Sequence, residues 1–272
     1  MKFKITLYNL ICILLFINHK SIKMKKLLNL FLVFCMSFSY AQQRMYVGLH
    51  YVTVKNQDAQ AHIDSEKKYF SKLHKQAIDN GSKIGWDMWR LENPRYGEPH
   101  TTFVYAHLED PEDLYNYSGG DEIFSESELA MARERWGERV VKSGSVMTSY
   151  KGGFVPAANQ DPPKFVVLDW MMVSPLDYYE YEQTELKTFL PLQKANKIVK
   201  GWGLHKIVSP LNNNTEAASY IVARFFDSMP DIYNMMDQTN PMSKTMKATY
   251  KNILSLRKIK RSHVLSLVLS ER

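Results

Sequence analysis

Two short segments of this chain occur twice in the same order, and this repeat is the strongest constraint on its fold. Gly85-Trp86 recurs 116 residues later as Gly201-Trp202. Asp113–Asn116 recurs 118 residues later as Asp231–Asn234. A long and nearly constant spacing indicates that one structural unit has been used twice. We therefore expect two similar units within one chain.

The basic character of the chain is concentrated at its N-terminus. Residues 1–41 carry six lysines and no acidic residue, and the other residues hold 29 basic and 28 acidic side chains. The formal charge therefore falls from +7 to +1 when residues 1–41 are left out. A balanced charge removes the main reason to expect a nucleic-acid partner.

Met24–Ala41 has the pattern of a secretory signal peptide. Lys25-Lys26 precedes the apolar stretch Leu27–Phe38, which is too short to span a bilayer. Ser39 and Ala41 then supply the small residues at positions −3 and −1 of a cleavage site between Ala41 and Gln42. We expect cleavage there, a periplasmic or secreted protein without a stable membrane anchor, and Met24 as the start of translation. A tandem anchor that includes Leu7–Ile17 is the alternative.

Both cysteines, Cys12 and Cys35, lie within this leader. The chain after residue 41 therefore has no cysteine. Disulfides, thiolate metal sites and cysteine nucleophiles are excluded for that part of the chain.

The pattern of apolar residues predicts strand, helix, strand, strand, helix, strand in residues 42–155, and the same order in residues 164–272. The polar, proline-containing segment 156–163 is the expected linker. The expected strands are Met45–Val54, Ile84–Leu91, Thr101–Leu108, Ser145–Phe154, Phe165–Val173, Trp202–Val208, Ser219–Phe226 and His263–Leu269. The expected helices are His62–Asn80, helical segments between Pro111 and Val141, Tyr178–Lys200 and Pro230–Leu256.

A βαββαβ unit is the ferredoxin-like motif, which leaves one face of a four-stranded sheet bare. Phe165–Leu168 and Tyr220–Ala223 are apolar on both sides, as strands buried on both faces should be. On this topology and duplication the chain resembles the dimeric α+β barrel superfamily as a fused tandem repeat. We expect an α+β fold of two ferredoxin-like repeats, with antiparallel sheets packed face to face as a pseudo-dimeric barrel. Two domains without a shared sheet interface are the alternative.

The resemblance also carries expectations about activity and assembly. The superfamily includes cofactor-free monooxygenases, isomerases and haem-handling enzymes, so enzymatic activity is permitted but no reaction is specified. A fused repeat already satisfies the pairing that single-repeat relatives achieve by dimerising, so a monomer or weak homo-oligomer is expected. The sequence contains no P-loop, no dinucleotide fingerprint, no His-Glu-x-x-His and no nucleophile elbow.

Polar and aromatic residues within the apolar strands are the candidates for a site. His50 lies in the middle of the first strand, and Asp169 is its repeat partner. We expect an apolar cavity between the sheets that binds a small apolar or aromatic molecule. Its polar groups are His50, Asp169, His205 and Arg224, and its aromatic walls are Trp86, Trp89, Tyr105, Trp170 and Trp202.

In this hypothesis His50 or His205 is the acid/base, because the pKa of histidine suits proton transfer near neutral pH, and Asp169 orients it. The alternative for each residue is an ordinary core role, with His50 and Asp169 as a satisfied pair. Arg224 aligns with Ala106 in the strand pattern, so it could instead face the helices.

No metal site and no cofactor are predicted. A haem would need an axial ligand, for which His50 or His205 would serve only in a large cavity. His62 and His74 are expected on the exposed side of their helix. A non-catalytic envelope scaffold or interaction module is the alternative function, and the methionine-rich segment from Met229 to Met246 would be its adaptable surface.

Overall fold

A computed structural model describes residues 45–93, 97–110, 122–155, 161–210, 217–237, 239 and 241–272. The predicted leader, the first copy of the repeated segment at Asp113–Asn116 and most of the expected linker 156–163 lie outside the described residues. Export and signal cleavage therefore stay predictions. Residues 44–272 group into one compact unit.

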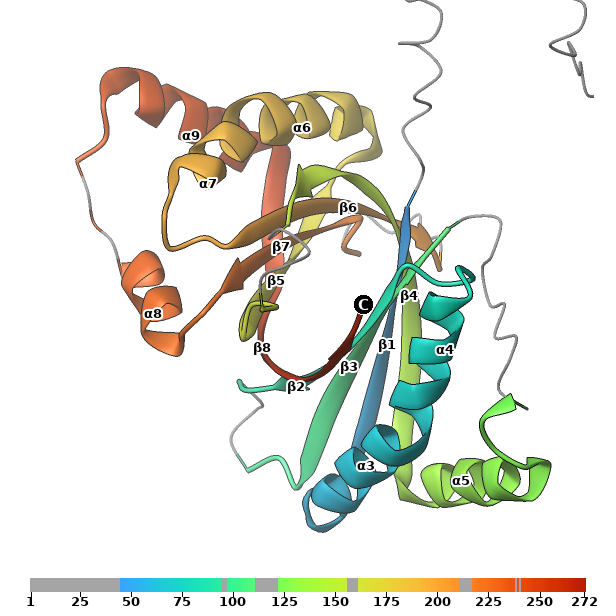
Figure 1. Ribbon diagram of the computed structural model, residues 1–272. Coiled ribbons are helices and arrows are strands. Elements are labelled where there is room, and N and C mark those ends of the chain that lie inside the picture. The colour runs from blue at the N-terminus through green and yellow to red at the C-terminus, as the bar shows by residue number, and fades with distance from the viewer. Residues whose placement is uncertain are drawn as a thin grey trace, which may run out of the picture. The chain divides into compact units, whose positions relative to one another are not determined.

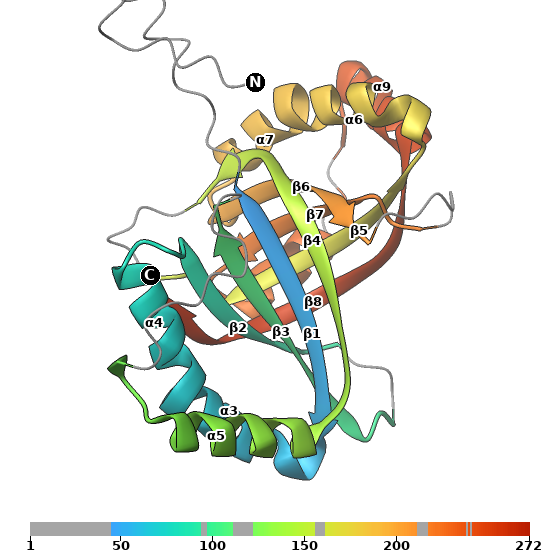
Figure 2. The same ribbon diagram turned by 90° about the vertical axis from the view of Figure 1, so that its right-hand side faces the viewer.

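Eight antiparallel strands form one closed barrel in the order β1-β3-β2-β8-β5-β7-β6-β4 (Figures 1 and 2). The strands of the first half are β1 Tyr46–Lys55, β2 Gly85–Leu91, β3 His100–Glu109 and β4 Val140–Phe154. Those of the second half are β5 Phe165–Val173, β6 Gly201–Ser209, β7 Tyr220–Phe226 and β8 Arg257–Glu271.

The halves are joined through their strand edges. Around the barrel the first half has the order β4-β1-β3-β2, and the second half has the corresponding order β8-β5-β7-β6. The closing pairs are β2 with β8 and β4 with β6. The expected face-to-face packing of two sheets is therefore corrected to one continuous wall, and the alternative of two domains without a shared sheet is wrong. The physical reason is that edge pairing satisfies backbone groups that two open sheets would leave unpaired.

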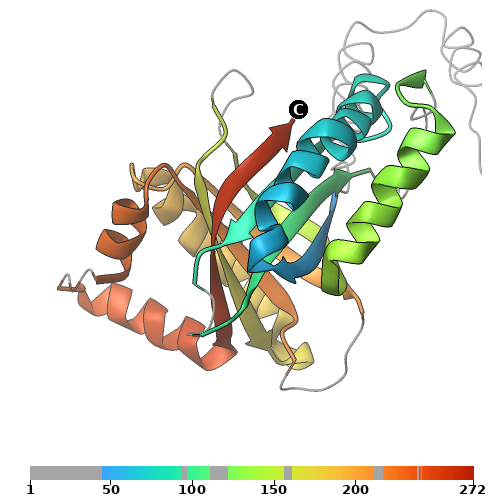
Figure 3. The ribbon, with the colours of Figure 1, turned by 90° about the horizontal axis from the view of Figure 1, so that it is seen from below.

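The helices lie outside the barrel wall, with α3–α5 on one side and α8 and α9 on the other (Figure 3). The helical elements of the first half are η1 Asn56–Asp58, α3 Ala59–Ser65, the π-helical turn η2 Glu66–Phe70, α4 Ser71–Asp79 and α5 Glu126–Arg139. Those of the second half are η4 Pro175–Asp177, α6 Tyr178–Thr184, the π-helical turn η5 Glu185–Phe189, α7 Leu190–Ala195, α8 Met229–Asp237 and α9 Lys244–Leu256. Across the described residues, no helix combines the length and apolar character needed to cross a bilayer.

Local sequence explains where several helices begin and end. Gly81 has φ of +80°, so it adopts the left-handed conformation that follows many helix ends, just beyond α4. Ser125 caps α5 through a reciprocal pair with Glu128. The expected single helix His62–Asn80 contains a π-turn, which adds a residue to one turn and shifts the faces of the helix relative to a regular pattern.

Side chains alternate across the barrel wall and form three cores. Buried residues of both halves fill the barrel interior, among them Leu49, Trp89, Leu168, Trp170 and Ile221. A second core lies between the outer wall of the first half and its helices, and a third core lies between the outer wall of the second half and its helices. Successive residues of a strand point to opposite faces of the wall. Alternate residues therefore join the barrel interior, and the residues between them join the core beneath the helices.

Candidate functional site

A pocket of about 380 Å³ lies between the first-half helices and the outer face of β1, β2 and β3. Its apolar lining comes from Phe70, Leu73 and Leu129, and its aromatic lining includes Trp86 and Trp136. The helices that line the pocket are α4 and α5, drawn near β1 and β4 in Figure 1. An apolar hollow with a few polar groups is the usual form of a small-molecule site.

The central polar group of this pocket is the buried carboxyl of Glu66, the first residue of the π-turn η2. The Tyr105 hydroxyl and the Trp136 indole N–H each donate to its Oε1 over 2.9 Å. The hydrogen bonds that described residues make to Glu66 all end on Oε1, so Oε2 remains for a ligand. Burial raises the pKa of Glu66 to about 7, against the opposing effect of the two donors.

His62 holds the tyrosine of this group in place. Its Nε2 lies 2.6 Å from the Tyr105 hydroxyl oxygen, and its ring stacks on Phe103 at 5.3 Å between centroids. Because the Tyr105 proton goes to Glu66, His62 is the donor to Tyr105. Burial lowers the pKa of His62 to about 4, with a contribution from Arg139, so the ring is neutral near pH 7.

The other end of the pocket is bordered by His74, Trp86 and His107. The His74 ring stacks on Trp86 at 4.7 Å and meets His107 edge to face at 5.2 Å. Behind them Lys83 donates to Glu109 over 2.6 Å and lies 3.3 Å from Nδ1 of His107. Burial lowers the pKa of His74 to about 3 and that of His107 well below its ordinary value, and Lys83 adds to both shifts.

Three of the nine residues predicted from sequence meet in this pocket: His50, Trp86 and Tyr105. His50 projects from the outer face of β1, with its ring centroid 6.0 Å from that of Tyr105 and 6.2 Å from that of Trp136. Burial lowers the pKa of His50.

A second group of predicted residues, Asp169, Arg224 and Trp202, belongs to the outer face of the second half. Arg224 pairs with Asp169 over 2.5 Å, and the Ser262 hydroxyl also donates to Asp169. Trp202 is fully buried in the core beneath the second-half helices. Arg224 therefore faces the helices, and strand pairing aligns it with His107 rather than Ala106, because it pairs with Trp202 as His107 pairs with Trp86.

The third group, Trp89, Trp170 and His205, points into the barrel. Trp89 packs against Phe225 at 6.2 Å, and Trp170 belongs to the same interior core. His205 lies with its ring 5.4 Å from that of Tyr150, and burial lowers its pKa to about 4.

The expectation of one cavity between the sheets is therefore corrected, since the predicted residues divide among three places. The reason is the alternation of side chains: His50 and Asp169 both point outward from strands in different halves, whereas His205 points inward. The barrel interior is occupied by large apolar side chains of both halves. The described pocket lies outside the wall instead.

Sequence reasoning missed Glu66, His62 and Trp136, and it placed His62 and His74 on an exposed helix face. His62 is in fact fully buried, and His74 borders the pocket. One sequence signal could have found Glu66: the pattern Glu-x-Lys-x-Phe of Glu66–Phe70 recurs as Glu185–Phe189. Its spacing of 119 residues equals the spacing between His50 and Asp169.

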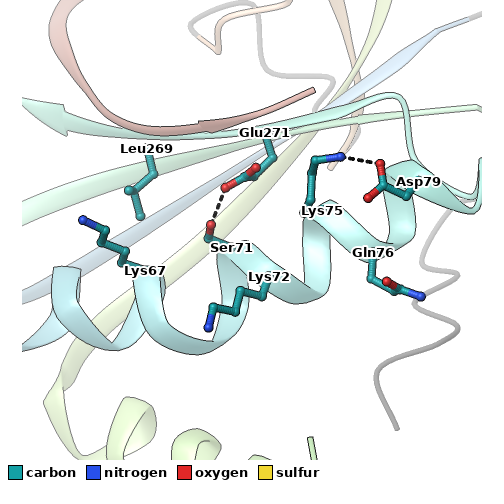
Figure 4. A pocket seen from close by; sticks show the side chains of 8 residues that line it. All are labelled: Lys67, Ser71, Lys72, Lys75, Gln76, Asp79, Leu269 and Glu271. Carbon is teal, nitrogen blue, oxygen red and sulfur yellow. Dashed lines mark hydrogen bonds and ion pairs between the residues drawn. The ribbon is translucent and has the colours of Figure 1, made fainter. Parts of the chain in front are cut away.

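A separate hollow of about 400 Å³ lies between α4 and the end of β8. Figure 4 shows Ser71 bonded to Glu271 and Lys75 paired with Asp79 in this hollow. Its side chains are mostly charged, and both acids drawn there have partners. We regard it as a feature of the charged surface.

Within the part of the chain that the structure describes, no three His, Cys, Asp or Glu side chains are arranged to hold a metal ion. Of the two histidines considered for haem, His205 lies within the filled barrel and His50 borders the pocket. Haem binding stays an untested alternative.

Comparison with known proteins defines the class of fold. No protein-family model and no curated protein matches the sequence. A crystal structure from Fusobacterium nucleatum subsp. nucleatum, provisionally named a monooxygenase, is similar with a TM-score of 0.60 and 11% identity, covering 84% of this chain and 94% of the other. Another provisionally named monooxygenase, from Lactobacillus acidophilus, has a TM-score of 0.54 and 9% identity, covering 84% and 96%.

At these identities the likeness concerns the fold alone. The resemblance to the dimeric α+β barrel superfamily is confirmed at that level, and no specific family is identified. The chain is an α+β protein with a closed antiparallel barrel of eight strands.

Proposed function

We propose that this protein binds a small aromatic or apolar molecule in the pocket outside β1–β3 and transfers a proton to or from it through Glu66. The observation that carries the proposal is a buried carboxyl beside a pocket, with both described donors on one oxygen and the other oxygen left for a ligand. The size and apolar lining of the pocket suit a molecule of one or two rings.

Glu66 has the properties of an acid/base that works near neutral pH. Its pKa of about 7 leaves both protonation states populated, which is the condition for efficient general acid or base catalysis. A proton from a ligand C–H or O–H bond would pass to Oε2, and its electron pair would remain on the ligand. Tyr105 and Trp136 would hold the carboxylate in place through Oε1.

This proposal revises the roles suggested by the sequence. His50 stays beside the reacting group as part of the pocket wall, but His205 and Asp169 lie elsewhere in the fold. The names of the two similar structures agree with an activity on small molecules.

The architecture supports two further proposals. We propose that 42–155 and 164–272 are two ferredoxin-like repeats that form a pseudo-dimer within one chain, because the strand order is the same in both halves. We also propose that the chain from Gln42 onward acts in the periplasm or outside the cell, as a monomer or weak homo-oligomer. The support for export is the predicted signal peptide, and the balanced charge of residues 42–272 argues against a nucleic-acid partner.

Proton transfer can be tested with 2-indanone, a small aromatic ketone with exchangeable C–H bonds next to its carbonyl. The wild-type protein in D₂O is expected to speed deuterium uptake, and Glu66→Gln is expected to lower the protein-dependent rate about a hundredfold or more. The matched control is Glu185→Gln, which changes the corresponding acid of the second half and should keep the rate. Uptake no faster than in buffer, or an unchanged rate in Glu66→Gln, would contradict the proposal.

The location of the site has its own test. Leu129→Trp should fill the pocket and abolish 2-indanone binding measured by calorimetry, because Leu129 lines it. Leu254→Trp places the same side chain on an exposed position of α9 and should leave binding unchanged. Equal binding by both variants would show that the ligand is held elsewhere.

The alternative function, an envelope scaffold or interaction module, has one observation in its favour. Met236 on α8 and Met242 just beyond it are about half exposed, at 50% and 43%, and Tyr233 and Leu254 are more exposed still. Adaptable side chains of this kind suit a protein-binding surface. A protein that binds no small aromatic molecule in the tests above would favour this alternative.

A further inference from the structure

A second set of polar groups lies at the end of the pocket away from Glu66, and the role inferred for it rests on the proposed function of that pocket. Lys83 precedes β2, is 3% exposed, and sends its ammonium group between two residues of β3. Its Nζ donates to Oε1 of Glu109 over 2.6 Å and lies 3.3 Å from Nδ1 of His107. Burial lowers the pKa of Lys83, and the hydrogen bond and charge of Glu109 oppose that shift and favour the ammonium form.

An ammonium group has hydrogens to donate and no lone pair to accept. Nδ1 of His107 must therefore be the acceptor from Lys83, and the single proton of the neutral imidazole must lie on Nε2. Nε2 makes no hydrogen bond with any described residue, and the partly exposed ring borders the pocket. The contact with Lys83 thus makes Nε2–H the polar atom that His107 can offer to a ligand.

Trp86 lies beside this donor but cannot add to it. It is the cross-strand partner of His107, it borders the pocket, and it is fully buried. Its indole N–H has no hydrogen-bond partner among the described residues, and the nitrogen itself is closed off, so a ligand oxygen in the pocket does not reach it. Nε2–H of His107 is therefore the donor at this end of the pocket.

We infer that Lys83 is a positioning residue that holds His107 as an Nε2–H donor, and that this donor forms a subsite for an acceptor oxygen of the ligand. Tyr105 and His107 lie two residues apart on the same face of β3, about 7 Å along the strand. Since Tyr105 contacts Glu66, a ligand of one or two rings can reach both ends of the pocket.

This arrangement specifies a class of ligand: a flat molecule that presents a removable proton to Glu66 and a carbonyl or hydroxyl oxygen, conjugated with that position, to His107. When the proton passes to Oε2 of Glu66, the electron pair stays on the ligand and negative charge develops on the oxygen. The N–H donor of His107, already in place, would stabilise that charge without rearrangement. The step needs no oxidant or reductant.

The tautomer can be measured in the ligand-free wild-type protein by nitrogen-15 NMR of labelled histidine at pH 7. His107 is assigned through the signals lost in His107→Gln. We expect an unprotonated Nδ1 and a protonated Nε2, and in Lys83→Met we expect the proton to redistribute between the two nitrogens. A wild-type His107 with its proton on Nδ1 would overturn the role of Lys83, whether or not any ligand binds.

The subsite is tested by calorimetric titration with 2-indanone and indane, which have the same carbon skeleton and differ by the carbonyl oxygen. Wild type should prefer 2-indanone by about tenfold, the value of one hydrogen bond. His107→Gln and Lys83→Met should reduce this preference, and Lys75→Met, which changes a lysine at the surface of α4, should keep it. Equal affinity of wild type for both probes overturns the subsite, and absence of binding by both overturns the proposed function with it.

Discussion

The two halves of the barrel place a glutamate at the same point of the fold and surround it differently. Glu66 and Glu185 are each the first residue of a π-turn outside the wall, and both are buried. Tyr105 pairs across the strands with His50, and Val222 pairs in the same way with Asp169, so Val222 takes the place of Tyr105. The tyrosine at this strand position thus has no equivalent in the second half, where the hydroxyl that acts on Glu185 comes from Tyr181 on α6.

The second half instead uses guanidinium groups. Arg257 begins β8 and lies 3.4 Å from Glu185, and Arg224 pairs with Asp169 beside it. The corresponding first residue of β4 is Val140, so the first half has an apolar side chain where the second half has this cation. Glu66 therefore meets neutral donors, and Glu185 meets a permanent positive charge.

Under the proposed function, this difference separates the carboxyl that exchanges a proton from one that holds the structure together. Burial raises the pKa of both groups, but only for Glu185 does an arginine oppose that shift. A carboxyl with neutral partners can exchange a proton without breaking an ion pair, whereas one held by arginine loses a charge pair when it is protonated. The first half is thus the half suited to proton transfer.

The largest expected effect tests the structural role of the second-half acid. Arg257→Met should lower the free energy of unfolding by about 4 kcal/mol at pH 7, because it leaves the buried Glu185 without its cation. Urea unfolding measures this loss. Adding Glu185→Gln should recover much of it, since the uncompensated charge is then removed. A loss below about 1 kcal/mol would show that the pair does not distinguish the halves.

The next effect concerns the pH dependence that Glu66 gives to stability. Its pKa is about 7 in the folded state against 4.5 in the unfolded state, so the folded state holds more protons between these values. Stability from this group is therefore fully present below about pH 4.5 and is lost as the pH rises to about 7, by about 3 kcal/mol in all. Glu66→Gln should lack this loss.

The measurement is urea unfolding of both proteins from pH 4.5 to 8. The histidines titrate in both proteins, so the difference between them isolates Glu66. The variant should gain about 3 kcal/mol relative to wild type across this range. If the free energies of unfolding of the two proteins follow parallel curves against pH, folding does not raise the pKa of Glu66. The exposed Glu122→Gln is the control, and its curve should follow that of wild type.

A smaller effect tests the neutral donors. Tyr105→Phe removes one hydrogen bond that favours the charged carboxylate, so the pKa of Glu66 should rise by roughly one unit above 7. Carbon-13 NMR of the labelled carboxyl measures the titration. The buried Tyr181→Phe in the second half is the matched change and should leave the Glu66 titration as it is. An unchanged pKa in Tyr105→Phe would show that burial alone sets it.

The sequence predicted the strand framework well, because apolar alternation marks each buried strand. Phe165–Val173 was predicted with its observed bounds, and the other strands differ mainly at their ends. β4 begins at Val140 and β8 at Arg257, each earlier than expected, because these first residues are largely exposed and carry no apolar alternation. The expected helix Pro230–Leu256 is divided into α8 and α9.

The site was harder to predict, because it depends on which face of the wall each residue reaches. The strand pattern related His50 to Asp169, which hold corresponding positions in β1 and β5, but it could not show that both point outward. Glu66 is followed by two lysines and resembles a solvated helix position, although it lies one turn beyond the buried His62 and faces the same core. Both residues were misjudged because the buried face of this helix is polar, and apolar periodicity does not reveal it.

The smallest expected effect sets a baseline for the buried charges. Lys75 and Asp79 form an ion pair along α4, and their side chains are 44% and 55% exposed (Figure 4). Lys75→Met should change the free energy of unfolding by less than about 0.5 kcal/mol, because water and salt screen such a pair. The same substitution at Lys83, which is buried against Glu109, should cost several-fold more. Urea unfolding of the two variants gives the comparison, and equal costs would mean that burial does not distinguish the charged groups behind the pocket from those at the surface.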